Sequence, residues 1–588
     1  MAVDQSPMNK LITEHIDIWT SAVKTKSASG RGSNKKLELY GVKKLRELIL
    51  ELAVRGKLVS QDPSDEPASV LLERIAQEKA QLVKDKKIKK TKPLSSVKEQ
   101  EKTFDIPRGW SWTRIGLITT FVNGFAFKSS SFQDSGVGIV KIGDISFAGE
   151  LTPNTMSRVD TSVIKDLDPS LRVNRGDMVI AMSGATTGKV GFNTTNEVFY
   201  LNQRVGKFIP HQIDLDYLFF PLTTKIAENL EKSLGSAIPN LSTGQINDIV
   251  IALPPLQEQH RIVAKVDELM ALCYQLEQQT EASIEAHQVL VTTLLDTLIN
   301  SADADELMQN WARISEHFDT LFTTEESIDQ LKQTILQLAV MGKLVPRDPS
   351  DEPAAELLKR IAEEKAQLVK DKKIKKQKAL PPISEDEKPF ELPNGWEWCR
   401  IQDVALFTTS GSRDWAKYYS DSGALFVTMG NLSRGSYELR LDNLRFVRPP
   451  KGGEGSRTKL EARDLLISIT GDVGNLGLIP EEFGEAYINQ HTCLLRFMPE
   501  CQGKYFPDFM RSPLAKYQFD APQRGIKNSF RLSDVGEMHL PLPPLKEQVR
   551  ITEKVSDLLS ICERLKVRLR ESQITQLHLT DAIVERAV

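Results

Sequence analysis

Apolar residues recur at helical spacing along two long segments of the chain. Steps of three or four residues, sustained over many turns, predict long helices packed as a coiled coil. The first stripe comprises Ile262, Val266, Leu269, Cys273 and Leu276 and continues at Leu290, Leu294 and Leu298, and the second comprises Ile551, Val555, Leu558, Cys562 and Leu565. A helix over about residues 257–300 would be roughly 65 Å long. That length disfavours the alternative, an ordinary amphipathic helix on a globular core.

The chain also contains an internal repeat. Residues 45–94 match residues 331–380 at 37 of 50 positions, with a shift of 286. Weaker matches extend the repeat: GWSW at 109–112 returns as GWEW at 395–398, Asn202-Gln203 as Asn489-Gln490, LPPLQEQHRI at 253–262 as LPPLKEQVRI at 542–551, and ITEHIDIW at 12–19 as ISEHFDTL at 314–321. The register changes near residues 21–36, in the polar segment KTKSASGRGSNKK, which we interpret as a flexible insertion in the first copy.

The two copies diverge unevenly, because their flanks are nearly identical while the middles, 104–250 and 390–540, share only scattered anchors. We infer that the flanks do one job twice and the middles do two different jobs. The expected organisation is an N-terminal helical segment (1–103), a first globular domain (104–252), a central helical region (253–389), a second globular domain (390–541) and a C-terminal helix (542–588). Since the N-terminal segment resembles 308–330 and the C-terminal helix resembles 257–300, the two chain ends are expected to meet.

Before each middle, the pattern is helix, turn, helix. The SDEP motif at 64–67 and 350–353 combines a capping side chain, acidic residues and proline, which is typical of a helix start. Each of these helices ends in KDKKIKK, at 84–90 and 370–376. Such a run is usually a solvated face that suits the helix dipole. The alternative is a patch that contacts DNA phosphates beside the globular domain.

Each middle shows short β-rich runs separated by Gly, Asn and Asp turns, with helical segments near 215–233 and 505–520, which predicts a mixed α/β domain of about 150 residues. The loops carry side chains that can donate to bases and phosphates. For any one of them plain surface exposure is the simpler explanation, so only the set is proposed as a DNA contact. It comprises Lys128, Arg158, Lys189, Asn202, Gln203, Arg204, Asn240 and Gln245 in the first middle, and Arg413, Lys417, Arg457, Asn475, Gln490, His491, Arg524, Lys527 and Asn528 in the second.

Composition adds limits. The net charge is −3, which counts mildly against a DNA binder unless basic loops are segregated from acidic helices. Five widely spaced cysteines without a CxxC pair argue against disulfides and zinc, and with no secretory pattern or long apolar run they favour a cytoplasmic protein. GATTGKV at 184–190 is not a nucleotide loop, since three residues separate its glycines and no Ser or Thr follows Lys189. No motif for methyl transfer or other catalysis and no metal-binding motif is found.

The repeated LAVRGKLVSQDPSDEPASVLLERI block and the LPPLxEQxRI helix starts resemble the specificity subunits of Type I restriction–modification enzymes, of the Type IB kind, over nearly the whole chain. The resemblance implies two target recognition domains, each of which reads half of a split DNA site. It also implies an antiparallel helical pair that sets the spacer, with pseudo-twofold symmetry. Two methyltransferase (modification) subunits would dock on the flanks, and motor–nuclease (restriction) subunits would join them. S-adenosylmethionine, ATP and magnesium would be bound by those partners, and this chain would be non-catalytic.

Two alternatives stay open at this point. A stand-alone DNA methyltransferase with built-in recognition domains would show turnover without partners. A coiled-coil scaffold that binds only proteins would show no sequence-selective affinity for DNA.

Overall fold

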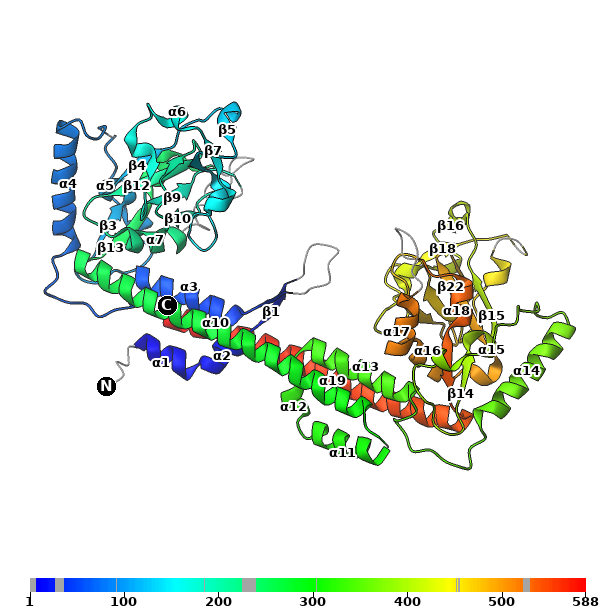
Figure 1. Ribbon diagram of the computed structural model, residues 1–588. Coiled ribbons are helices and arrows are strands. Elements are labelled where there is room, and N and C mark those ends of the chain that lie inside the picture. Colours follow the sequence, from blue (N-terminus) through cyan, green and yellow to red (C-terminus); the bar gives the residue numbers. More distant parts are fainter. Residues whose placement is uncertain are drawn as a thin grey trace. The chain divides into compact units, whose positions relative to one another are not determined.

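The repeat in the sequence is a repeat in the structure. The computed structural model describes residues 7–26, 36–90, 92–184, 186–224, 240–302, 304–450, 452, 455–521 and 529–588. The chain forms two compact units, of which one comprises Met1–Ala282 with Gln573–Val588 and the other Ser283–Ser572. Each unit holds one globular domain, called reader 1 and reader 2 below, together with a helical flank (Figure 1).

The flanks contain the expected helices. In the first unit they are α1 (Pro7–Glu14), α2 (Ile16–Ser21), α3 (Tyr40–Val54), α4 (Ala68–Lys84) and the start of α10 (Leu256–Ile299). In the second they are α11 (Ala304–Ser315), α12 (Phe318–Leu321), α13 (Glu325–Val340), α14 (Ala354–Lys370) and the start of α19 (Leu545–Ala587). No described helix is long and apolar enough to cross a lipid bilayer.

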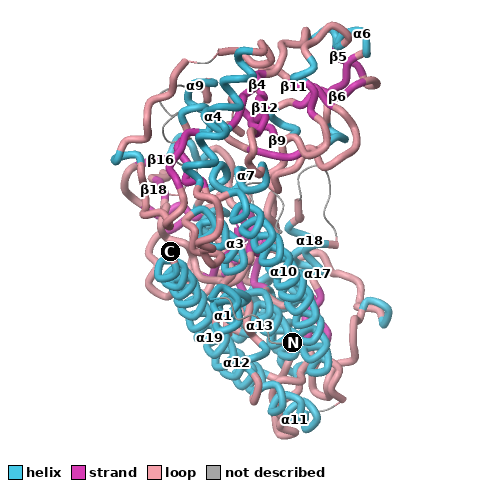
Figure 2. Tube along the Cα trace, turned by 90° about the vertical axis from the view of Figure 1, so that its left-hand side faces the viewer, coloured by secondary structure: helices cyan, strands magenta, loops and turns pink. Residues whose placement is uncertain are grey.

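The chain ends meet as expected, because the last residues of α19 belong to the first unit. Tyr40 Oη of α3 donates a hydrogen bond to Asp581 of α19 at 2.7 Å. Helix α3 also lies alongside α10 (Figure 2), where Arg46 pairs with Glu277 at 2.5 Å. The C-terminal segment thereby completes the helical layer of the first unit.

The apolar stripe on α10 follows the prediction except around Leu290. Ile262, Val266, Leu269 and Cys273 are buried, but Leu290 is 49% exposed. In the second half Leu298 is buried as predicted and Leu294 is half-buried, and Val291 and Leu295 complete the buried face, which shares one core with α13 and with the predicted stripe of α19. Steps of exactly four residues drift around a helix of 3.6 residues per turn, so a stripe through Leu290 leaves the core face.

Both readers have the same topology, except that β8 of reader 1 has no counterpart among the described strands of reader 2. Reader 1 contains a sheet of order β10-β9-β12-β4 and a second of order β5-β7-β6-β11-β8; reader 2 contains β20-β19-β22-β15 and β16-β18-β17-β21. The first sheet is formed by β4 (Thr119–Asn123), β9 (Met178–Ala181), β10 (Val190–Phe192) and β12 (Val205–Pro210), and the second by β5 (Phe132–Gln133), β6 (Val137–Val140), β7 (Ser157–Val159), β8 (Arg172–Val173) and β11 (Phe199–Leu201). Their counterparts are β15 (Ala405–Ser410), β16 (Tyr419–Ser420), β17 (Ala424–Val427), β18 (Arg445–Val447), β19 (Leu465–Ser468), β20 (Leu476–Leu478), β21 (Ala486–Ile488) and β22 (Thr492–Phe497). A mixed α/β fold is confirmed.

The helices of the readers differ in part from the prediction. Helix α7 (Leu215–Thr224) begins where expected, and residues 225–233 lie outside the described residues. In reader 2 the expected helix is two, α16 (Tyr505–Met510) and α17 (Pro513–Asp520). The insertion near 21–36 is bounded by an antiparallel pair, β1 (Lys24–Lys26) and β2 (Lys36–Glu38), and residues 27–35 lie outside the described residues.

Each reader is closed by pairing its first strand with its last. β3 (Ser111–Arg114), from the GWSW segment, pairs with β13 (Val250–Leu253), which runs into the Pro-Pro pair before α10. β14 (Glu397–Arg400) pairs with β23 (His539–Leu542) in the same way. These pairs bring the SDEP, aromatic and LPPLxEQxRI motifs of each copy to one junction between reader and flank.

The SDEP motif acts at this junction as an ion-pair partner. The first residue of α4 follows Pro67, and no side chain caps that helix, so the expectation of a capping serine is wrong. Asp65 instead pairs with Arg261 of α10 at 2.6 Å, and Asp351 pairs with Arg550 of α19 at the same distance. In both copies, therefore, the aspartate of the SDEP motif contacts the arginine of the LPPLxEQxRI motif.

The Glu-Gln pair of the LPPLxEQxRI motif is buried at the same junction. It is Glu258-Gln259 in the first copy and Glu547-Gln548 in the second. Gln259 donates to the Pro254 carbonyl at 3.0 Å, and Gln548 donates to the Pro543 carbonyl at 2.9 Å. These bonds fix the first turn of each long helix on the end of the closing strand. The junction is built alike in both copies, which explains in physical terms why its residues are retained.

Replacement of both junction glutamates by glutamine is expected to raise stability at neutral pH and to leave it unchanged at pH 4 or below. Burial raises the pKa of Glu258 and of Glu547, and the Gln61 amide opposes the shift at Glu258. A carboxyl whose pKa is raised by folding binds its proton more tightly in the folded state, so stability falls as pH rises past its unfolded pKa. Glutamine resembles the protonated carboxyl and does not ionise, so the variant does not lose stability as the pH rises. The thermal midpoint of E258Q/E547Q measured against pH tests this.

The exposed residue Glu553 of α19 supplies the control, since E553Q should leave the same curve unchanged. A lower midpoint of E258Q/E547Q at neutral pH would contradict the prediction.

Candidate nucleic-acid interface

Five loops of reader 1 converge at one end of its sheets. The loop face of reader 1, as we define it, consists of residues 123–131, 141–151, 182–184, 186–189, 202–204 and 240–243. Main-chain hydrogen bonds join it: Asn202 N donates to Val140 O at 3.1 Å, Met182 N to Arg204 O at 2.8 Å and Leu241 N to Met182 O at 2.8 Å. The strands that deliver these loops are buried, so the loop tips are held on a rigid base.

Reader 2 has an equivalent loop face, consisting of residues 411–413, 428–435, 469–475, 489–491 and 529–530. Ile469 N donates to His491 O at 3.0 Å, and Phe530 N donates to Ile469 O at 2.9 Å. These bonds match those of Met182 and Leu241 in reader 1. The frame is thus the same in the two readers, while the side chains on it differ.

Most predicted contact residues of reader 1 lie on or beside its loop face. Gln203, Arg204 and Asn240 are exposed on it, Asn202 and Lys189 are half-buried, and Lys128 is exposed within its first loop. Partial burial lowers the pKa of Lys189.

Two predicted residues of reader 1 have partners within the protein. Arg158 donates to Gly136 O at 2.9 Å and lies 3.6 Å from Glu197, at the opposite end of β6 from the loop face. The Gln245 side chain accepts hydrogen bonds from Ser242 N and Oγ at the start of α9 (Thr243–Asp248), although the residue is exposed.

In reader 2, Arg413 is exposed on the loop face, and Gln490 and His491 are half-buried on it. His491 Nδ1 lies 2.8 Å from Thr470 Oγ1, and His491 Nε2 lies 3.0 Å from Gln490 Nε2. Lys417 and Arg457 are exposed outside the loop face as we define it. Arg524, Lys527 and Asn528 lie outside the described residues.

Asn475 does not fit the expectation of a surface contact, because it is only 7% exposed. Its amide donates to Asp472 at 2.9 Å, and its main-chain N–H donates to Ser468 Oγ at 2.8 Å. These bonds hold the loop between β19 and β20 in shape. We therefore assign Asn475 a structural part in the loop.

Sequence analysis missed two exposed residues on the loop faces. Phe147 of reader 1 is 94% exposed, with Lys189 Nζ 3.3 Å from its ring centroid. Arg434 of reader 2 pairs with Asp472 at 2.9 Å. A comparison of the two copies around Ser146 and Ser433, which share the shift of 287, would have placed Phe147 and Arg434 opposite one another.

The KDKKIKK runs have the same local structure in both copies. Lys86 and Lys372 adopt left-handed backbone, with φ of 58° and 56°, after the last turns of α4 and α14. The lysines of both runs are exposed, while Ile88 and Ile374 are half-buried. A solvated helix end accounts for this arrangement, and phosphate contact stays a prediction.

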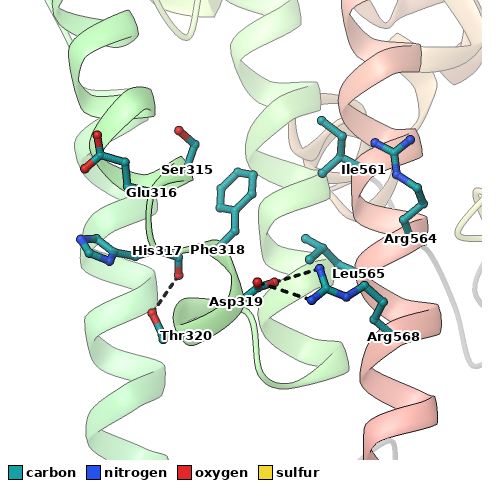
Figure 3. Close-up of a pocket in the computed structure, with 10 residues that line it drawn as sticks. All are labelled: Ser315, Glu316, His317, Phe318, Asp319, Thr320, Ile561, Arg564, Leu565 and Arg568. Atoms are coloured by element: carbon teal, nitrogen blue, oxygen red, sulfur yellow. Dashed lines mark hydrogen bonds and ion pairs between the residues drawn. The ribbon is translucent and has the colours of Figure 1, made fainter.

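A groove lies on the helical flank of the second unit (Figure 3), lined by Ser315, Glu316, His317, Phe318, Asp319, Thr320, Ile561, Arg564, Leu565 and Arg568. Asp319 pairs with Arg568 at 3.2 Å across it. Acidic and basic groups balance here, so the groove offers no basic surface to a nucleic acid.

The described residues hold no group of three His, Cys, Asp or Glu side chains that could bind a metal ion. The GATTGKV segment joins the antiparallel strands β9 and β10. A nucleotide loop joins a strand to a helix, where the helix N-terminus binds phosphate, so this segment lacks that geometry. All five cysteines are free and buried.

Comparison with known proteins agrees with this architecture. A model of the Type I restriction modification DNA specificity domain matches residues 107–286 and 393–575. The chain is 40% identical over 623 residues to the Type I restriction enzyme EcoEI specificity subunit of Escherichia coli, with 99% of this chain and 100% of that protein covered. It is 41% identical over 611 residues to the EcoAI specificity subunit of Escherichia coli, with the same coverage. The crystal structure of the HsdS subunit from Thermoanaerobacter tengcongensis is 17% identical, covering 82% of this chain and 98% of that chain, with a TM-score of 0.42.

Proposed function

The chain belongs to the DNA specificity subunits of Type I restriction–modification systems, and we propose that each reader recognises one half of a bipartite DNA site. The observation that carries the proposal is the pair of equivalent loop faces with different side chains. Arg204 and Asn240 stand where His491 and Ser529 stand in reader 2. Arginine, asparagine and histidine can donate to base edges, and different sets select different bases.

The subunit is itself non-catalytic, so its partners supply the chemistry. We propose that two modification subunits bind the two flanks and that restriction subunits join this assembly. S-adenosylmethionine, ATP and magnesium would then be bound by those partners. A complex that acts on chromosomal DNA, together with buried free cysteines, supports a cytoplasmic location.

Equivalent exposed leucines on the long helices support two equivalent docking surfaces. Leu290 on α10 is 49% exposed, and Leu579 on α19, at the repeat shift of 289, is 45% exposed. Apolar side chains that are exposed at equivalent positions of the two copies are consistent with a surface that one kind of partner covers in each copy. Because the flanks are nearly identical, one kind of partner can bind both.

Exchange of residues 104–252 for the first reader of a relative is expected to change one half of the methylated DNA sequence and to leave the other half intact. The physical reason is that the junction contacts are outside the loop face and are the same in the two copies. Methylated positions mapped in the DNA of cells that carry this chain with its modification subunits give the readout.

The matched control is exchange of residues 390–541, which should change only the other half. A change in both halves, or in neither, would contradict the proposal. Methyl transfer by the purified chain alone would favour the stand-alone methyltransferase. Absence of sequence-selective DNA binding with all partners present would favour the scaffold.

A further inference from the structure

One loop position carries different side chains in the two readers on the same backbone frame. A single 3-10 turn follows β6 at Ile142–Asp144 and follows β17 at Met429–Asn431, and each turn is capped by the side chain that ends it. A buried aliphatic residue and a serine come next in both. The residue after them is Phe147 in reader 1 and Arg434 in reader 2.

A second loop lies against this position in each reader. It is the hairpin loop between β9 and β10 or between β19 and β20, and glycines in left-handed backbone hold its shape. Their φ values are 85° at Gly184, 87° at Gly188, 74° at Gly471 and 87° at Gly474. In both readers this hairpin loop also bridges the last loop of the loop face, so the position borders the proposed DNA surface.

In reader 1 the two loops meet through a cation and an aromatic ring. Lys189 Nζ lies 3.3 Å from the ring centroid of Phe147, which is within the range of a cation–π contact. The Phe147 side chain is 94% exposed, so the contact orients the ring while leaving nearly all of its surface accessible to solvent. A single exposed phenylalanine needs no explanation by itself.

In reader 2 the two loops meet through a guanidinium. Arg434 Nη2 lies 2.9 Å from Asp472 Oδ1 and donates to Val473 O at 3.0 Å, while the side chain is 60% exposed. A guanidinium has five N–H donors in a planar fork, and both contacts fall on one nitrogen. The fork is thus held in one orientation before any ligand binds, which lowers the entropy lost on binding.

We propose that Phe147 and Arg434 occupy one equivalent base-reading position, at which Arg434 selects guanine and Phe147 contacts the methyl group of thymine. This rests on the proposed function of the two loop faces. Arginine held as a fork matches O6 and N7 of guanine in the major groove, and an apolar side chain matches the thymine methyl. The two readers thereby recognise two different bases from one equivalent backbone position.

An ordinary surface explanation exists for each residue alone. An exposed ion pair such as that of Arg434 contributes little to stability and is common on protein surfaces. What favours base reading is the coincidence of three observations: equivalent frames, side chains of different chemistry, and a second loop that positions each of them.

The Arg434→Gln variant tests the proposal in the complete complex with its modification subunits and a library of DNA sites. One base pair in the half-site of reader 2 is expected to lose its preference for guanine by about ten- to a hundredfold, because glutamine lacks the fork. The half-site of reader 1 should stay unchanged. Asp472→Asn should weaken the preference at the same base pair, since it releases the arginine. The control is Arg463→Gln, which removes another exposed arginine of reader 2, one paired with Glu481 at 2.7 Å, and should change nothing.

The corresponding variant of reader 1 is Phe147→Ala. It should relax the choice of thymine at one base pair severalfold, while Val198→Ala, which shortens another exposed apolar side chain of reader 1, should leave the half-site unchanged.

Unchanged selectivity in both Arg434→Gln and Phe147→Ala would overturn the proposal. So would an equal loss of methylation at all sequences, which indicates a phosphate contact. If Arg434→Gln stops methylation altogether, Asp472→Asn decides: relaxed choice at one base pair supports the proposal, and an unchanged half-site overturns it. Failure of the proposed function itself is seen separately, because the unaltered chain would then select no sequence in the same assay.

Discussion

Replacement of Arg496 by methionine is expected to destabilise reader 2 by about 3–5 kcal/mol, the usual loss when a buried ion pair is left without one partner. Arg496 on β22 binds the Asp464 carboxylate through Nε and Nη2, at 2.6 Å each. The Asp464 side chain is only 1% exposed, so water cannot replace the guanidinium. Loss of amide protection along β19 and β22, measured by hydrogen exchange, reports the effect inside reader 2.

Replacement of Lys207 by methionine in reader 1 is expected to cost less, about 1 kcal/mol. Lys207 on β12 pairs at 3.0 Å with Asp177, the residue equivalent to Asp464 at the shift of 287, but the Asp177 side chain is 24% exposed. Lys207→Met therefore leaves a carboxylate that water can reach. The comparison tests whether burial of the remaining carboxylate determines the size of the loss.

The pH dependence of the Arg496→Met variant should follow from the same cause. Burial raises the pKa of Asp464, and Arg496 opposes that shift, so the pKa rises further when the arginine is removed. The deficit in stability should be complete above that raised pKa and should shrink as pH falls toward the unfolded pKa of about 3.9. Asp464→Asn combined with Arg496→Met should recover part of the stability. Equal losses in the two readers, or no recovery in the double variant, would contradict this account.

The architecture could be predicted because the sequence contains the same pattern of elements twice. The helix expected over 257–300 is observed at Leu256–Ile299, and short strands form in both middles, as their β-rich runs predicted. Local periodicity carries that information. The pairing of β3 with β13 could not be predicted in this way, since it joins residues about 140 positions apart and depends on the tertiary fold.

The loops that form the candidate site could be predicted from the sequence, whereas the individual contact residues could be predicted only in part. Residue type alone favoured Asn475 and Arg158, yet one is buried and the other is bonded within the protein. Phe147 was missed for the opposite reason, because a phenylalanine is expected in a core and this one is 94% exposed. Exposure is set by packing between distant segments, which no single loop sequence contains.

Insertion of seven residues into each long helix is expected to lengthen the unread gap between the two half-sites and to leave both halves unchanged. Residues 256–282 of α10 belong to the first unit and 283–299 to the second, while α19 is divided between 572 and 573. Matched insertions after Ala282 and Ser572 add about 10 Å to each helix at 1.5 Å per residue. That length corresponds to about three base pairs of DNA at 3.4 Å each, which sets the upper limit of the change. Methylation mapping gives the gap directly.

The number of inserted residues distinguishes a rigid helical spacer from a flexible one. Seven residues turn a helix by nearly two full turns, with a drift of only about 20°, so the buried stripes that include Cys273 and Cys562 keep facing the core. Matched insertions of five residues turn the following segment by about 140° and present polar residues to the core, so they should abolish methylation. A flexible tether would tolerate both insertions alike. A lengthened gap with seven residues and loss of activity with five therefore supports a rigid helical spacer, whereas an unchanged gap or altered half-sites would contradict it.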